Sequence, residues 1–109
     1  MKPKQTIEYV KQVLGVEIAP FKLAEWAKEG LLGEVVVRKQ GHKDYSSTNA
    51  QRVVICTMLS YFKWRQGDIK KLLVDKDILL KERVKEDLVK FQTKFLSAIK
   101  QLELDKVIG

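Results

Sequence analysis

The sequence predicts a mainly α-helical protein, in which a compact head carrying a small β-hairpin is followed by one long helix. Three observations lead to this prediction. Apolar residues recur at helical spacing through most of the head, a β-branched run interrupts that spacing at Glu34–Arg38, and a heptad pattern fills the end of the chain. We therefore expect a helical head with a small hairpin over residues 1–76 and a coiled-coil dimerisation helix over residues 77–109.

Composition limits the class of protein. A chain of 109 residues, 45% of them hydrophobic, has room for one small core, and no apolar run is long enough to span a membrane. The single cysteine, Cys56, excludes an internal disulfide and fits a reducing compartment, so we expect a cytoplasmic protein and a buried thiol. We expect no metal ion, no cofactor and no enzymatic activity, because the chain lacks a metal-spaced ligand set, a glycine-rich phosphate loop and a catalytic constellation.

The positive charge is distributed unevenly. The net charge is +7, and residues 46–74 carry five basic groups against one acidic group, whereas residues 75–109 carry eight against seven. A basic excess ahead of a nearly neutral tail is typical of a head that binds a polyanion. The alternative interpretation is an ordinary basic protein with no nucleic-acid partner.

Two short helices joined by a glycine-containing turn are predicted at the start of the head. Thr6 is expected to cap the first helix, Gly15 to end it, and residues 1–5 to form a mobile basic segment. Pro20 suits the first turn of the second helix and Gly30 suits its end. The expected inner face of the second helix consists of residues at helical spacing: Leu23, Trp26 and Ala27.

A hairpin and two more helices follow. Glu34–Arg38 is too short for a buried helix and predicts a strand, residues 39–42 form a turn, and Lys43–Tyr45 returns. A basic hairpin beside a helix-turn-helix is a wing, which reaches the DNA backbone or the minor groove. The capping residues at 46–49 open a third helix that runs to Phe62, and Asp68 is expected to cap a fourth. The apolar positions of these helices are Ala50, Val53, Val54, Met58, Leu59, Phe62, Ile69, Leu72 and Leu73.

The tail from Ile78 to about Leu104 has the most regular pattern. A helix of about 25 residues would be about 37 Å long, which is more than a small head covers. Part of the helix therefore needs another chain or a fold-back of its own chain to cover it. Of these two, we expect a parallel or antiparallel dimer through a seam whose members are spaced by 4, 3, 4, 3 and 4 residues: Val84, Leu88, Phe91, Phe95, Ala98 and Leu102.

The order of these elements resembles the MerR family of bacterial transcription regulators over residues 6–74. Leu23, Trp26 and Glu29–Leu32 are similar to the family's second helix, and Gly41–Tyr45 is similar to its wing motif Gly-Tyr-Arg-x-Tyr. The resemblance implies a winged helix-turn-helix that binds double-stranded DNA as a homodimer, with the second helix in the major groove. The short tail implies a form without an effector-binding domain. Phage and plasmid excisionases are equally similar in the head.

The chain also departs from the family pattern. The connection before the second helix is about two residues longer than usual. Ala24 and Glu25 stand where the family commonly has an arginine and a tyrosine that contact DNA, and His42 replaces the first aromatic residue of the wing. The family's DNA contacts are therefore not carried over as a set.

Candidate DNA contacts come from three places in the head. A helix in the major groove uses its N-terminal residues, which favours Lys22 as a DNA contact. Phe21 either meets a thymine methyl group or packs at the helix entrance against the first helix, and we favour packing. Trp64 is expected to join the head to the tail. The candidates are Phe21, Lys22, Glu25 and Lys28 on the second helix, Arg38, Lys39, His42, Lys43 and Tyr45 on the hairpin, and Lys63 and Arg65 between the third and fourth helices.

The predicted function is sequence-specific binding of double-stranded DNA by a homodimer, as a small bacterial, plasmid or phage transcription regulator. Two alternatives from other classes remain. One is an architectural, recombination or segregation factor of the excisionase type that binds DNA cooperatively. The other is an adaptor whose head and tail bind other proteins.

Overall fold

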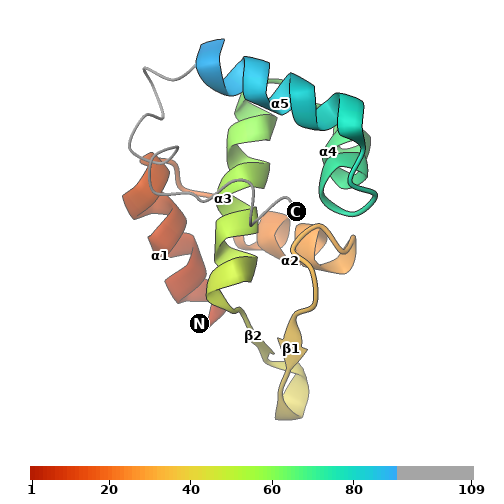
Figure 1. Cartoon of the computed structure of the whole chain (residues 1–109). Coiled ribbons are helices and arrows are strands. Elements are labelled where there is room, and N and C mark those ends of the chain that lie inside the picture. The colour runs from red at the N-terminus through yellow and green to blue at the C-terminus, as the bar shows by residue number, and fades with distance from the viewer. Residues whose placement is uncertain (91–109) are drawn as a thin grey trace.

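The structure of the protein is a computed structural model that describes residues 1–90 and the side chains of residues 1–87. This part of the chain is mainly helical, with five α-helices and one small antiparallel hairpin that projects from the helical body (Figure 1). The elements are, in chain order, α1 Pro3–Leu14, α2 Pro20–Lys28, β1 Val36–Val37, β2 Lys43–Asp44, α3 Ser47–Tyr61, α4 Gln66–Leu73 and α5 Ile78–Lys90.

The ends of α1 and α2 follow local signals. Gly15 ends α1 in the left-handed region, with a φ of 72°. At the end of α2, Gly30 has a φ of 78°, its N–H donates to Ala27, and the Leu31 N–H donates to the Trp26 carbonyl. These two hydrogen bonds form a Schellman motif, which satisfies carbonyl groups that the helix leaves unpaired. The predicted ends of both helices are confirmed.

Residues 1–5 were predicted to be mobile, but the structure shows them ordered. Helix α1 begins at Pro3, and Thr6 lies inside it as a buried residue whose hydroxyl donates to the Lys2 carbonyl. Met1 is bound at the base of the hairpin, where its ammonium group donates to Asp44 and to the Tyr45 carbonyl at 2.8 and 2.6 Å. The prediction was wrong because this segment is ordered by residues more than 40 positions away.

The hairpin is short and tightly turned. Val36 lies opposite Asp44 and Val37 lies opposite Lys43. The turn between them, Lys39–Gly41, places Gln40 at a φ of 67° and Gly41 at 76°. A hairpin of this length is marginal alone, so its attachment to Met1 matters for its position.

Helix α3 forms the centre of the molecule, and α1 and α4 pack against it (Figure 1). Its start is a capping box in which Ser46 and Asn49 exchange hydrogen bonds between side chain and backbone. Residues 53–59 of this helix are all buried, so α3 lacks the polar face of a surface helix. The buried core residues include Val10, Leu23, Trp26, Leu31, Leu32, Val53, Val54, Met58, Leu59, Ile69, Leu72 and Leu73.

Helix α4 begins at Gln66, with Arg65 as its N-cap residue, so Asp68 lies within the first turn and is not the cap that the sequence predicts. Helix α5 begins at Ile78, as predicted, and packs against α4. Val84 of α5 is 3% exposed and belongs to the core of its own chain, so it is not a surface for dimerisation. Of the other predicted dimer contacts, the Leu88 side chain and Phe91, Phe95, Ala98 and Leu102 lie outside the described residues.

Trp64 joins the head to α5, as its prediction proposes. The indole N–H donates to an Asp87 carboxylate oxygen at 2.6 Å, and the Arg83 guanidinium lies 4.3 Å from the ring centroid. A charge-assisted hydrogen bond and a cation–π contact therefore act between the α3–α4 corner and α5.

Among the described residues, no helix is long and apolar enough to cross a membrane.

Candidate nucleic-acid interface

The outer face of α2 is partly apolar. Phe21 is 72% exposed, and Ala24 and Lys28 are exposed on the same side of the helix at positions i, i+3 and i+7. The exposure of Phe21 contradicts its predicted packing against α1. An exposed aromatic ring in the first turn of a helix is available to a partner.

Lys22 does not project freely from this face. Its ammonium group lies 3.4 Å from a Glu25 carboxylate oxygen and 5.7 Å from the centroid of the Trp26 ring. Both contacts draw the lysine along its own helix. Lys22 and Glu25, two predicted DNA contacts, therefore neutralise each other in this structure.

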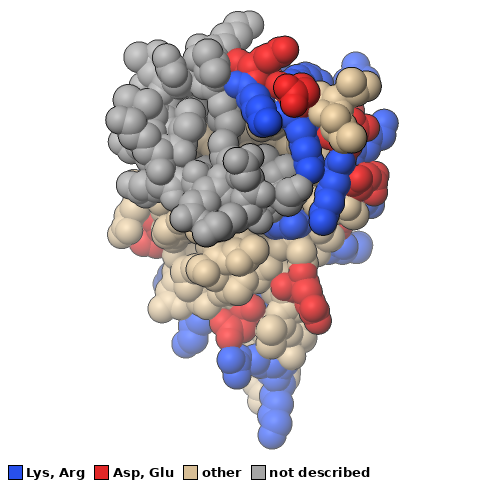
Figure 2. Space-filling model, in the orientation of Figure 1, with Lys and Arg blue, Asp and Glu red and all other residues tan. Residues whose placement is uncertain are grey.

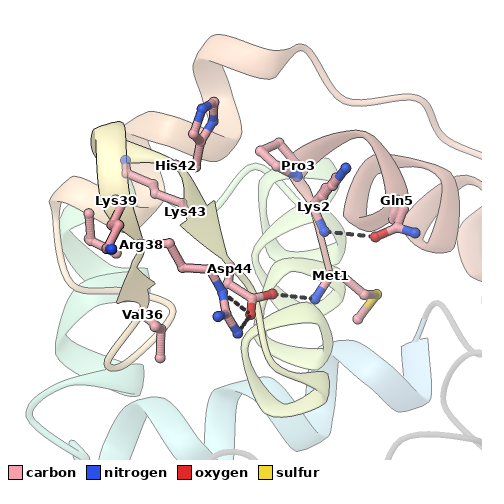
Figure 3. A pocket seen from close by; sticks show the side chains of 11 residues that line it. Met1, Lys2, Pro3, Gln5, Val36, Arg38, Lys39, His42, Lys43 and Asp44 are labelled. Carbon is pink, nitrogen blue, oxygen red and sulfur yellow. Dashed lines mark hydrogen bonds and ion pairs between the residues drawn. The ribbon is translucent and has the colours of Figure 1, made fainter.

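The hairpin combines one paired cation with others that have no ion pair. Arg38 donates to one Asp44 oxygen through Nε at 3.0 Å and through Nη2 at 2.7 Å. The hydrogen bond from the Met1 ammonium group, with the bonds from Arg38, lowers the pKa of Asp44 below its ordinary value of 3.8. Figure 3 shows the Asp44 carboxylate between Arg38 and Met1.

The other basic residues of the hairpin are free to meet an anion. In the part of the chain that the structure describes, no acidic side chain forms an ion pair with Lys39 or Lys43. His42 is exposed beside them. Basic side chains gather at the end of the projecting hairpin (Figure 2).

A groove joins α2 to the hairpin, and we call it the α2–hairpin groove. It has a volume of about 590 Å³. Its apolar lining comes from Phe21, Ala24, Ala27, Val35 and Val37. Its charged lining comes from Glu25, Lys28 and Lys43. The candidate DNA contacts on α2 and on the hairpin were predicted separately. In the structure, several of them line this one groove.

A second groove, of about 1040 Å³, lies between the hairpin and the start of α1 (Figure 3). Arg38, Lys39, His42 and Lys43 line it together with Lys2. Lys43 lines both grooves, so it lies where the two surfaces meet. The four predicted hairpin contacts other than Tyr45 thus occur together.

Tyr45 is not available as a DNA contact. It is 2% exposed in the core, and its backbone N–H donates to the Met1 carbonyl at 2.7 Å. Burial raises the pKa of the Tyr45 hydroxyl above its ordinary value of 10.0, because it disfavours the charged phenolate. Tyr45 anchors the base of the hairpin, and its predicted phosphate contact is wrong in this structure.

Lys63 and Arg65 are exposed but stand apart from both grooves. They follow the C-terminal end of α3, whereas the hairpin precedes its N-terminal end, and the 15 residues between span about 22 Å. The structure therefore makes this corner a separate basic site. Trp64 between them is buried.

Asn49 positions the candidate interface and was not singled out by sequence reasoning. Its side-chain amide donates to the Leu32 carbonyl at 2.6 Å and to the Glu34 carbonyl at 3.1 Å. It thereby holds the segment between α2 and β1 against the start of α3. Its place in a capping cluster was visible in the sequence, but the two long-range bonds had no local signal.

Other reactive groups add no second site in the described region. Burial raises the pKa of the Cys56 thiol to about 12, so the residue is an inert part of the core, as expected. The described residues hold no group of three or more histidine, cysteine or acidic side chains that could bind a metal ion.

Comparisons with known protein families, curated proteins and solved structures found no match.

Proposed function

We propose that the protein binds double-stranded DNA through the outer face of α2 and the hairpin, as a winged helix-turn-helix regulator of the MerR type. The observation that carries the proposal is the α2–hairpin groove, which joins Lys28 of α2 and Lys43 of the hairpin. A helix beside a basic projecting hairpin matches a duplex, whose major groove admits a helix while its phosphates meet the flanking cations.

Charge supports the same partner. Lys28, Lys39 and Lys43 have no ion pair among the described residues, whereas Arg38 and Lys22 are paired with carboxylates. Unpaired cations release counterions from DNA without first breaking an internal bond. In this proposal these three lysines contact phosphates, and Arg38 holds the hairpin in shape through Asp44.

We also propose that the protein acts as a homodimer. The support is the heptad spacing of Leu88, Phe91, Phe95, Ala98 and Leu102 in the sequence. A two-fold dimer would place two α2 helices at a fixed spacing, so its operator would be an inverted repeat. Regulation of transcription, which the resemblance to the MerR family implies, completes the proposal.

The salt dependence of DNA binding tests the proposal. Affinity for a random-sequence duplex of about 30 bp is measured by fluorescence anisotropy between about 50 and 200 mM salt. Each of the substitutions Lys28→Ala and Lys43→Ala should reduce the slope of log K against log salt by about 0.9, the value for one phosphate contact. Lys85→Ala, within α5, is the control and should leave the slope unchanged, because α5 lies at the opposite end of the helical body from the hairpin (Figure 1).

Three results would contradict the proposal. Absence of binding at about 50 mM salt would exclude a duplex partner, because non-specific affinity is greatest at low salt. Equal slopes for all three variants and the wild type would show that DNA binds elsewhere on the molecule. Weak binding that does not depend on salt would favour the protein-adaptor alternative.

A further inference from the structure

We infer that the α2–hairpin groove recognises the C5-methyl groups of thymine, so that the protein prefers duplexes with thymine at defined positions. The inference rests on the proposed DNA binding and assigns the chemical feature that the site reads. It depends on three properties of the groove: exposed apolar side chains on both elements, alanines in the part of the lining that α2 supplies, and cations beside this apolar part.

Exposed apolar side chains border the groove from both elements. Phe21 of α2 is 72% exposed and Val37 of β1 is 62% exposed. Leaving large apolar side chains in water forgoes the free energy of burying them. A partner that covers both would recover it, and the two come from elements 16 positions apart in the chain that meet at this groove.

Apart from Lys28, this face of α2 has few side chains that could read bases by hydrogen bonds. Ala24 and Ala27 have no polar side-chain atoms, and the Glu25 carboxylate is engaged by Lys22. Within the major groove, the thymine methyl is the apolar group that a base edge presents. An apolar side chain in the first turn of a helix is placed where such helices contact base edges, and Phe21 occupies that turn.

The charges beside the apolar lining favour DNA over an apolar peptide as occupant. Lys28 on α2 and Lys43 on the hairpin line the same groove. A duplex offers an apolar methyl in the groove with phosphates on each side, which matches apolar residues between cations. Duplex DNA is therefore the occupant that we propose for the groove.

The test compares one duplex sequence, enriched by selection from a random library, prepared once with thymidine and once with deoxyuridine. The two duplexes differ only by the methyl groups. The thymidine duplex should bind about fourfold more tightly for each methyl that is buried, which corresponds to about 0.8 kcal/mol. Phe21→Ala should bring this ratio close to one, and Val37→Ala should lower it.

Lys28→Ala is the matched control, since it lies on the same helix and lines the same groove. It should weaken binding to both duplexes by the same factor and leave the ratio of the two affinities unchanged. Circular dichroism melting checks that the Phe21→Ala variant keeps the fold, which its high exposure predicts.

The outcomes separate this inference from the proposed function. Equal, salt-dependent binding of both duplexes by the wild type would overturn methyl recognition and leave DNA binding intact. A thymidine preference that survives both Phe21→Ala and Val37→Ala would also overturn it, because the methyl would be read elsewhere. If no duplex is enriched and neither binds at low salt, the proposed function itself fails, and this inference with it.

Discussion

Asn49 is the residue on which the placement of the candidate interface depends. It is 3% exposed and uses both ends of its amide, donating to Leu32 and Glu34 and accepting from the Ser46 N–H. A buried polar group of this kind stabilises only while every bond is made. Its replacement therefore tests how the segment before β1 is held.

We predict that Asn49→Asp destabilises the protein by about 2–3 kcal/mol. An aspartate keeps the bond from Ser46, but its carboxylate would face the carbonyl oxygens of Leu32 and Glu34. Ser46→Ala, which removes one capping bond, should cost about 1 kcal/mol. Urea denaturation measures both, and equal losses would contradict the role assigned to the amide donors.

The lowered pKa of Asp44 predicts that this residue contributes to stability in a way that depends on pH. Its pKa is lowered by the Met1 ammonium group and Arg38, so the carboxylate favours the folded state above the unfolded pKa of about 3.8. That contribution is lost as pH falls through the folded pKa. Melting temperatures of the wild type and Asp44→Asn should differ at pH values above about 4 and converge in stronger acid. A difference that stays constant with pH would contradict this account.

Single residues were predictable where their surroundings are local. The proline and glycine signals at Gly15, Pro20 and Gly30 act within a few residues, and the structure confirms all three. Met1 and Asn49 act across 44 and 17 positions, which a pattern along the chain does not reveal. Phe21 was misassigned because periodicity gives the face of a helix but not whether a ring at its entrance finds a neighbour.

At the scale of elements, the end of α3 shows how a helix can stop without glycine. Lys63 has a φ of 68°, its N–H donates to Ser60, and the Trp64 N–H donates to Leu59. This is the same motif that ends α2, with lysine in the position where glycine is usual. A side chain in this conformation costs about 1–2 kcal/mol.

We predict that Lys63→Gly stabilises the protein by about 0.5–1 kcal/mol, because part of that cost is offset by the greater freedom of glycine in the unfolded chain. Lys71→Gly, inside α4, should instead destabilise it by about 1 kcal/mol. Thermal unfolding measures both. If the Lys63→Gly variant is more stable but binds DNA less tightly, the α3–α4 corner contacts phosphate. If its affinity for DNA is unchanged, Lys63 is not part of the interface.

Boundaries of most elements were predictable, and their packing was less so. The hairpin and the capping residues of α3 lie where the sequence places them. The predicted start of α4 was three residues too late, because Asp68 suits an N-cap but equally suits the first turn of a helix. The joining of α2 and the hairpin in one groove is a tertiary property that neither segment specifies alone.

On the scale of the whole molecule, α5 belongs to the head over its first turns. Val84 lies in the core, and Trp64 with Asp87 fastens the helix to the α3–α4 corner. The heptad pattern alone gave Val84 the same role as Leu88 and its successors. A repeating seam does not say which of its members face their own chain.

This division predicts different behaviour for two variants. Val84→Ala should lower the free energy of unfolding by about 2 kcal/mol, through two buried methyl groups and the space they leave, without changing the dimer dissociation constant. Phe95→Glu should yield a monomer, and Thr93→Glu, off the seam, should remain dimeric. Sedimentation velocity and denaturation at two protein concentrations separate the effects. A monomeric Val84→Ala variant, or a dimeric Phe95→Glu variant, would contradict this division.

Selection of duplexes from a random DNA library at about 0.15 M salt, followed by sequencing, tests the central claim most directly. The account predicts enrichment of an inverted repeat whose half-sites contain thymine, with a spacing set by the dimer. Enriched direct repeats would contradict the symmetric regulator and favour the architectural alternative. No enrichment, together with negligible affinity in low salt, would contradict DNA binding altogether.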